Sequence, residues 1–374
     1  MNLAAKTYQL TFLLCLVCLS LSRSSAQSLP QWGKLKPGAY AAGLRSFMKA
    51  VVAIITVTLL ALCHAAAQTK TASEPGGRNK PGFVYDAAKK KFVLFGGFGG
   101  RGEPTRGDTW EWDGRQWTRL EVTGPAPRGA MGMAYDSKRK RAVLFGGYGT
   151  APFGDTWEWD GKSWQQVAST GPSARSVPQM VYDSRRQKVV LFGGKDGAKP
   201  LGDTWEWDGK HWKQVAASGP APRLHHFMVY DSGRGKAVLF GGNQAASPPP
   251  AAGLLGDTWE WDGKQWTKAA EAGPLKRDHH GMSYDHARGR VVLFGGWSGE
   301  FLGDTWEWDG TRWTESAARG PSARGGVPSL AYDSDRQRVV LFGGWDATGA
   351  VSDIWEWDGR QWREVKAAGA SAHQ

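Results

Sequence analysis

The chain has 374 residues and a formal net charge of +12, with 51 glycines, 21 tryptophans and three cysteines. All three cysteines lie in residues 1–67, so residues 68–374 can hold no thiolate metal site, cysteine nucleophile or disulfide of their own. Six of the 47 basic residues and none of the 35 acidic residues also lie in 1–67, which leaves +6 for residues 68–374. Because no polybasic run accompanies this modest charge, we expect no nucleic-acid partner.

The N-terminal region contains two segments that resemble export signals. Lys6 precedes an apolar run over 10–21, Lys49 precedes a second apolar run over 50–62, and small residues follow each run. A basic start, an apolar middle and a small-residue end are typical of secretory signals. We therefore expect residues 1–67 to direct or anchor the chain and residues 68–77 to form a polar linker.

Three arrangements of these signals are compatible with the sequence. The true start is Met48, or the first signal is cleaved and residues 50–67 remain as a membrane anchor, or the two segments are used in another way. The second alternative relies on a run of only 18 residues, which is near the lower limit for a membrane-spanning helix. Each arrangement predicts a secreted or periplasmic location for the remainder of the chain, with or without an anchor.

The rest of the chain is built from one repeated unit. Its most regular part, Gly-Asp-Thr-Trp-Glu-Trp-Asp-Gly, begins at Gly107, Gly154, Gly202, Gly256 and Gly303, and a variant with Ser and Ile begins at Ser352. A period near fifty residues with β-type residues in each copy indicates an array of one supersecondary unit. We place this domain at residues 78–366, followed by a tail over 367–374.

A single unit predicts four antiparallel strands. In the second unit these are 132–135, 141–145, 156–159 and 164–167, with a charged turn between the first two strands and an Asp-Gly hairpin between the last two. A Gly-Gly pair ends the second strand, and a loop of variable length follows it. The longest such loop, 243–255, lies in the fourth unit.

The repeated motifs (Val-Leu-Phe-Gly-Gly, Asp-Thr-Trp-Glu-Trp-Asp, a further Trp, then Gly-Pro and Arg) resemble kelch repeats and the central propeller of galactose oxidase-type proteins. The resemblance implies an all-β, six-bladed kelch-type β-propeller with four antiparallel strands per blade. Because each unit runs from first to fourth strand, we expect blades six and one to close the ring by packing, without a strand exchanged between the termini. Copper galactose oxidase activity is not expected, since the repeats lack the cysteine of that cofactor.

Departures from the repeat are the candidate site residues, because a single ligand site needs asymmetry. The residue after Gly-Gly is aromatic in four blades that are consecutive around a closed ring: Phe98, Tyr148, Trp297 and Trp345. In kelch-like propellers this loop and the one between blades lie on one face and often bind ligands. These aromatic rings either form a stacking platform for sugars or an apolar partner, or simply cover the strand ends.

Histidine and arginine residues near the start of each first strand form the other candidate group. Two adjacent blades carry histidine pairs, of which His226 and His280 occupy equivalent positions, and Asp278 precedes the second pair. At most one histidine of each pair can face a shared site, since neighbouring residues on a strand point in opposite directions. An arginine recurs in every blade, including Arg223 and Arg277, either to bind an acidic ligand or to pair with backbone or with a carboxylate of an adjoining blade.

These features favour a non-catalytic binding module that recognises a glycan or an extracytoplasmic protein as a monomer. We expect no cofactor and no metal. Two alternatives stay open: a carbohydrate-active enzyme resembling kelch-type sialic-acid epimerases, which would use the His, Arg and Asp residues at the channel mouth, and a structural scaffold of the cell envelope.

Overall fold

The computed structural model describes residues 51, 74–197, 199–245, 253–316 and 318–366. The chain divides into two units, Met1–Thr71 and Ala72–Gln374. Apart from Val51, the predicted export signals and the anchor over 50–67 lie outside the described residues, as does the tail over 367–374. No helix in the described part of the chain is long and apolar enough to cross a membrane.

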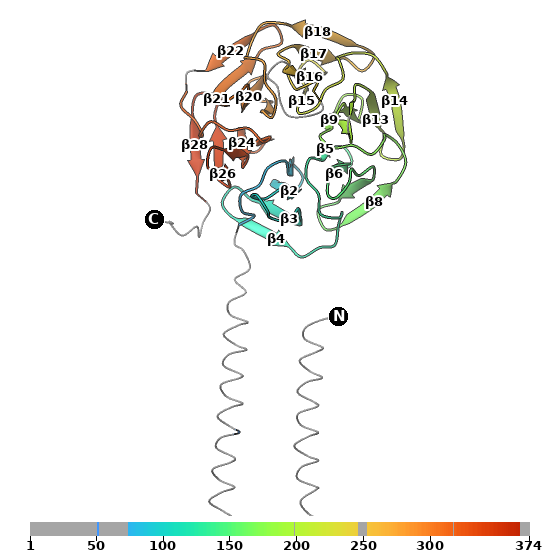
Figure 1. Ribbon diagram of the computed structural model, residues 1–374, viewed down its shortest axis with the longest axis vertical. Helices are drawn as coiled ribbons and strands as arrows, with labels where there is room; N and C mark the ends of the chain where they lie inside the picture. Colours follow the sequence, from blue (N-terminus) through green and yellow to red (C-terminus); the bar gives the residue numbers. More distant parts are fainter. Residues whose placement is uncertain (1–50, 52–73, 198, 246–252, 317, 367–374) are drawn as a thin grey trace, which may run out of the picture. The chain divides into compact units, whose positions relative to one another are not determined.

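The described residues of the unit Ala72–Gln374 form six four-stranded antiparallel sheets, as predicted, arranged around a common axis (Figure 1). Blades 1 to 3 comprise β1 to β4 (Gly82–Asp86, Lys91–Gly97, Arg106–Trp112, Trp117–Leu120), β5 to β8 (Gly132–Asp136, Arg141–Phe145, Thr156–Trp159, Trp164–Ala168), and β9, β10, β13 and β14 (Gln179–Asp183, Lys188–Phe192, Thr204–Trp207, Trp212–Ala216). Blades 4 to 6 comprise β15 to β18 (Phe227–Asp231, Lys236–Phe240, Thr258–Trp261, Trp266–Ala270), β19 to β22 (Gly281–Asp285, Arg290–Trp297, Phe301–Trp308, Trp313–Ser316), and β23, β24, β27 and β28 (Ser329–Asp333, Arg338–Phe342, Ile354–Trp357, Trp362–Val365). Two short hairpins, β11–β12 (Lys195–Asp196, Lys199–Pro200) and β25–β26 (Trp345–Asp346, Gly349–Ala350), extend blades 3 and 6.

The strand boundaries predicted for the second repeat, which forms blade 2, agree with β5 to β8 to within one residue. The agreement follows from the local signals: β-branched and aromatic residues form the strands, and Asp-Gly turns separate the last two. The first strand of each blade lies nearest the axis and the fourth lies at the rim, where Figure 1 shows β4, β8, β14, β18, β22 and β28.

The core lies between neighbouring blades and centres on each second strand. In β10, Val189 and Leu191 pack with blade 2, whereas Val190 and Phe192 pack with blade 4. Both faces of the strand are therefore buried, which explains why it is an unbroken apolar run without the alternation of a half-exposed strand. The second Trp of each Trp-Glu-Trp motif is also fully buried, for example Trp207 at 1% exposure.

Each sheet is made from one continuous segment, so the ring closes by packing and hydrogen bonding between blades 6 and 1, as predicted. The Gly344 amide donates to the Arg78 carbonyl at 3.2 Å, and the Arg78 amide donates to the Val351 carbonyl at 3.3 Å. Ile354 and Phe342 of blade 6 pack in one cluster with the aromatic residues of blade 1. Among the described residues, no strand is exchanged between blades 6 and 1.

Candidate functional site

The propeller has a cavity of about 550 Å³ at the ends of the channel strands where β1, β15, β19 and their equivalents begin. Blades 1, 3, 4, 5 and 6 contribute to its wall. The lining comes from two kinds of loop: the loop after each second strand and the loop that joins successive blades. These two loops therefore share one face, as the kelch resemblance implies, and the cavity falls in the size range of small-ligand sites.

Each blade has a backbone bridge between these two loops, and bridged residues of blades 1, 3, 4, 5 and 6 line the cavity. In blade 5, Trp297 and Asp278 exchange amide-to-carbonyl hydrogen bonds of 2.8 and 3.1 Å. Gly296 permits this pairing, because its φ is +111° and a Cβ there would lie 2.8 Å from the Asp278 carbonyl oxygen. The equivalent bridge in blade 4 joins Leu224 to Asn243. The residue after Gly-Gly is thus fixed beside the inter-blade loop, a pairing that the sequence analysis did not include.

The aromatic residues predicted to form one arc divide into two groups. Trp297 and Trp345 line the cavity, together with Phe301, which the sequence analysis missed and which pairs with Trp297 across the extended β20–β21 hairpin. Phe98 instead packs beside a small apolar cluster and covers Gly129, and Tyr148 is 41% exposed outside the cavity. Only half of the predicted arc therefore faces a common space.

The histidine pairs divide in the same way, with one member of each facing the cavity. His225 and His279 line it and stack on each other, with ring centroids 3.7 Å apart and planes 24° apart. His279 Nδ1 lies 2.7 Å from Asp278 Oδ1, and Asn243 Nδ2 donates to Asp278 Oδ2 at 3.3 Å. Both histidines have a φ of 55°, so each imidazole is set on a left-handed backbone.

His226 and His280, the members named from the sequence, are instead buried between blades at 1% and 0% exposure. Their rings meet Phe192 and Phe240 edge-on, each at 5.5 Å. Burial lowers the pKa of His226 to about 3, and burial lowers the pKa of His280 well below its ordinary value. Both pairs lie just before the first strand of their blade, where the left-handed residue of each pair faces the cavity and the next residue is buried between blades. The cavity is therefore lined by His225 and His279 and not by His226 and His280.

Burial also governs the charge of the groups that do face the cavity. It lowers the pKa of Lys80 to about 8, although Asp278 partly opposes this shift. It lowers the pKa of His225 well below the ordinary value, with further contributions from His279, Lys80 and Lys195. Burial also lowers the pKa of His279, and Asp278 offsets part of this change. Both imidazoles are therefore neutral at pH 7.

The recurrent arginines belong to the framework, and Arg223 and Arg277 lie outside the cavity at 0% exposure. Arg223 donates to both carboxylate oxygens of Asp257 at 2.7 and 3.0 Å, to the Gly241 carbonyl at 2.9 Å and to the Ala221 carbonyl at 3.0 Å. The carboxylate comes from the arginine's own blade, which corrects the expected partner in an adjoining blade. The adjoining blade instead meets the arginine's backbone: the Gly242 amide donates to the Arg277 carbonyl.

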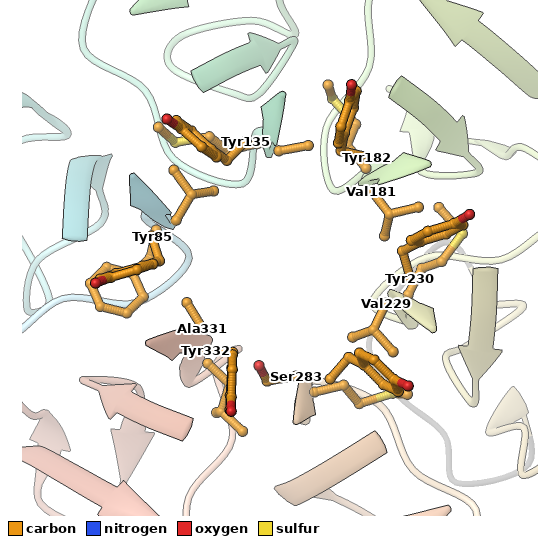
Figure 2. A pocket seen from close by; sticks show the side chains of 18 of the residues that line it. Tyr85, Tyr135, Val181, Tyr182, Val229, Tyr230, Ser283, Ala331 and Tyr332 are labelled. Carbon is orange, nitrogen blue, oxygen red and sulfur yellow. The ribbon is translucent and has the colours of Figure 1, made fainter. Parts of the chain in front are cut away.

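The opposite mouth of the channel is uniform. A tyrosine is the second-last residue of the first strand in every blade, and Figure 2 shows these side chains around a second cavity, of about 330 Å³. Three of their hydroxyls donate to carboxylates of the preceding blade: Tyr85 bonds Asp335 at 2.7 Å, and Tyr135 bonds Asp86 and Tyr230 bonds Asp183, both at 2.6 Å. Smaller side chains such as Val181, Val229 and Ser283 line the middle of that view (Figure 2).

Within the described ranges, no group of three or more His, Cys, Asp or Glu residues is placed to hold a metal ion.

Comparison with known families agrees with this architecture. The model of the KLHDC2/KLHL20/DRC7 Kelch-repeats domain matches residues 156–309, which run from the third strand of blade 2 to the end of the third strand of blade 5. The domain is a kelch-repeat β-propeller. Kelch propellers are commonly protein-binding modules, which is consistent with a non-catalytic binding role. Among curated proteins, none matches the sequence.

Proposed function

We propose that this kelch propeller is an exported, non-catalytic binding module that takes a glycan into the cavity lined by Trp297, Trp345 and Phe301. The juxtaposition of aromatic rings with amide, carboxylate and ammonium groups carries the proposal. Sugars present apolar C–H faces that stack on indoles and hydroxyls that bond to such polar groups. Asn243, Asp278 and the two facing histidines supply those bonding groups.

The enzymatic alternative loses most of the residues on which it depended. His226, His280, Arg223 and Arg277 are buried in the framework, and the arginines are fully engaged in hydrogen bonds. Asp278 alone of that set lines the cavity. A protein partner is the second candidate, since kelch propellers commonly bind proteins and Tyr148 is exposed on the loop after its blade's second strand.

A glycan array of the purified protein tests the proposal. We expect sugar binding by the wild type and at least about fivefold weaker binding by a Trp297→Ala/Trp345→Ala double variant, because two lost aromatic contacts at roughly 0.5–1.5 kcal/mol each remove about 1–3 kcal/mol. Tyr148→Ala is the matched control, since Tyr148 occupies the equivalent position in blade 2 outside the cavity. It should bind as the wild type does.

Two results would contradict the proposal. A folded wild-type protein that binds no glycan would exclude glycan recognition and direct the search to protein partners by affinity capture. Equal binding by the wild type and the double variant, with melting curves that show both to be folded, would move the site away from this cavity.

A further inference from the structure

Two lysines line the cavity, and in the part of the chain that the structure describes neither forms an ion pair. Lys80 ends the loop that enters blade 1, and Lys195 lies on the β11–β12 hairpin of blade 3. In the described part of the chain, neither ammonium group lies within ion-pair distance of a carboxylate, whereas Lys89, Lys91 and Lys236 of the framework each pair with a glutamate. The cavity lysines are also half-buried, so water solvates them incompletely.

The balance of charge in the cavity is positive. Asp278 is the one carboxylate among the lining residues that the structure describes, and it is already shared by His279 and Asn243. With both imidazoles neutral, two ammonium groups and one carboxylate leave a single positive charge. Lys195 lines the same cavity as Lys80, and its charge contributes to lowering the pKa of Lys80. A ligand with one negative charge would neutralise the cavity and relieve this repulsion.

The aromatic wall restricts the kind of anion. Trp297, Trp345 and Phe301 present apolar surface that a small inorganic ion would leave uncovered. A carboxylate attached to a sugar ring satisfies both parts of the cavity, since the ring can stack on an indole while the carboxylate accepts hydrogen bonds from ammonium groups.

We infer that the cavity selects carboxylated sugars, with Lys80 and Lys195 binding the carboxylate and Trp297 and Trp345 contacting the ring. This inference rests on the proposed glycan-binding function and names the class of glycan. The lysines then determine specificity for acidic over neutral sugars, and the aromatic residues provide affinity that both kinds of sugar share.

Calorimetric titration with two matched pairs of ligands tests the inference: trigalacturonate against its methyl ester, and sialyllactose against its methyl ester. Esterification removes the charge and leaves the rings unchanged. At pH 7 and low salt we expect at least one acid to bind about tenfold or more tightly than its ester. Added salt should reduce that ratio, because ions screen half-exposed charges.

Lysine variants then locate the selectivity. Lys80→Met and Lys195→Met should each remove most of the preference for the acid while leaving the affinity for the ester unchanged. Lys199→Met is the control, because Lys199 lies on the same hairpin as Lys195 but does not line the cavity. It should retain the full preference. Since Lys195 is on a surface hairpin, its variant remains informative even if Lys80→Met fails to fold.

The pH dependence gives an independent test. Lys80 faces Lys195, Asp278 and the two neutral imidazoles, and its own pKa is lowered to about 8. Lysine is charged below its pKa, so raising the pH from 7 to 9 should weaken binding of the acid by the wild type. Binding of the ester should not change, and in Lys80→Met the binding of the acid should lose most of this dependence.

The outcomes separate this inference from the proposed function. Equal affinity for acid and ester would overturn the charge selectivity and leave glycan binding standing. If neither acid binds while neutral glycans bind on the array, charge selectivity is likewise overturned and glycan binding stands. If no glycan binds on the array or in calorimetry, both the charge selectivity and the proposed glycan-binding function are overturned. Acid binding that needs the lysines but survives the Trp297→Ala/Trp345→Ala change would show a carboxylate site that does not recognise sugar rings.

Discussion

The two mouths of the channel differ in a way that separates framework from site. At one mouth every blade presents the same side chain, a tyrosine, and the hydroxyls of three of them bond to an acidic residue of the neighbouring blade. At the other, the residue five positions before that tyrosine has nearly the same backbone in all blades, with φ between 51° and 61°, yet carries different side chains: Lys80, Ala130, Val177, His225, His279 and Val327.

A constant backbone with variable side chains is what a ligand site on a symmetric scaffold requires. Left-handed φ values are unfavourable for valine in particular, so the surrounding blades must impose them. Hydrogen bonds between successive blades do so: the Val177 amide donates to the Ala130 carbonyl, and the Val327 amide donates to the His279 carbonyl. The framework therefore fixes where these side chains start, and the individual residues decide what the cavity binds.

The largest effect is expected from removing a framework arginine. Arg175→Met should lower the free energy of unfolding by about 3–5 kcal/mol, because it leaves the half-buried Asp203 without the bidentate partner that lies 2.6 and 2.9 Å away. Denaturant unfolding measures the change. Arg115→Met, on an exposed turn, should stay within about 0.5 kcal/mol of the wild type. A loss below about 1 kcal/mol in Arg175→Met would remove the argument that the arginine ring is structural.

A smaller change tests the uniform mouth. Tyr230→Phe deletes the 2.6 Å hydrogen bond to Asp183 and should cost about 1–2 kcal/mol, since Asp183 keeps its bonds to the turn that contains Arg186. Thermal unfolding measures this, with Tyr148→Phe as the control for an exposed ring. Ligand affinity at the opposite mouth should be unchanged. If Tyr230→Phe altered that affinity without altering stability, the tyrosine mouth would have to be counted as part of the site.

The smallest effect concerns the junction at which the ring closes. At five junctions the Trp of the fourth strand donates to a threonine of the preceding blade, as Trp313 does to Thr258 at 2.9 Å. At the sixth, Ile354 occupies the threonine position facing Trp117. Trp313→Phe should therefore cost about 1 kcal/mol more than Trp117→Phe, although both tryptophans are 8% exposed. Equal losses in urea unfolding would show that the indole hydrogen bond contributes no net stability.

The repeat predicted the fold closely because its signals are local. The Asp-Gly hairpins, the apolar second strands and the Trp-Glu-Trp motif specify strands and turns within one blade, and six copies specify the ring. The site was predicted only in part. Trp297, Trp345 and Asp278 do line the cavity, and their role in binding stays a prediction. His226 and His280 are buried between blades while His225 and His279 line the cavity, a difference that the residue pattern alone does not specify.

The repeated motifs therefore specify the architecture, the number of blades and the positions at which blades differ from one another. Which of those positions share a space depends on how the blades pack in three dimensions. Lys80 and Lys195 come from blades 1 and 3, and Trp345 comes from blade 6. They line one cavity because the ring closes and because the residues before each first strand have a left-handed backbone. Contacts between residues so far apart in the chain arise from the packing of whole blades, which no local pattern encodes.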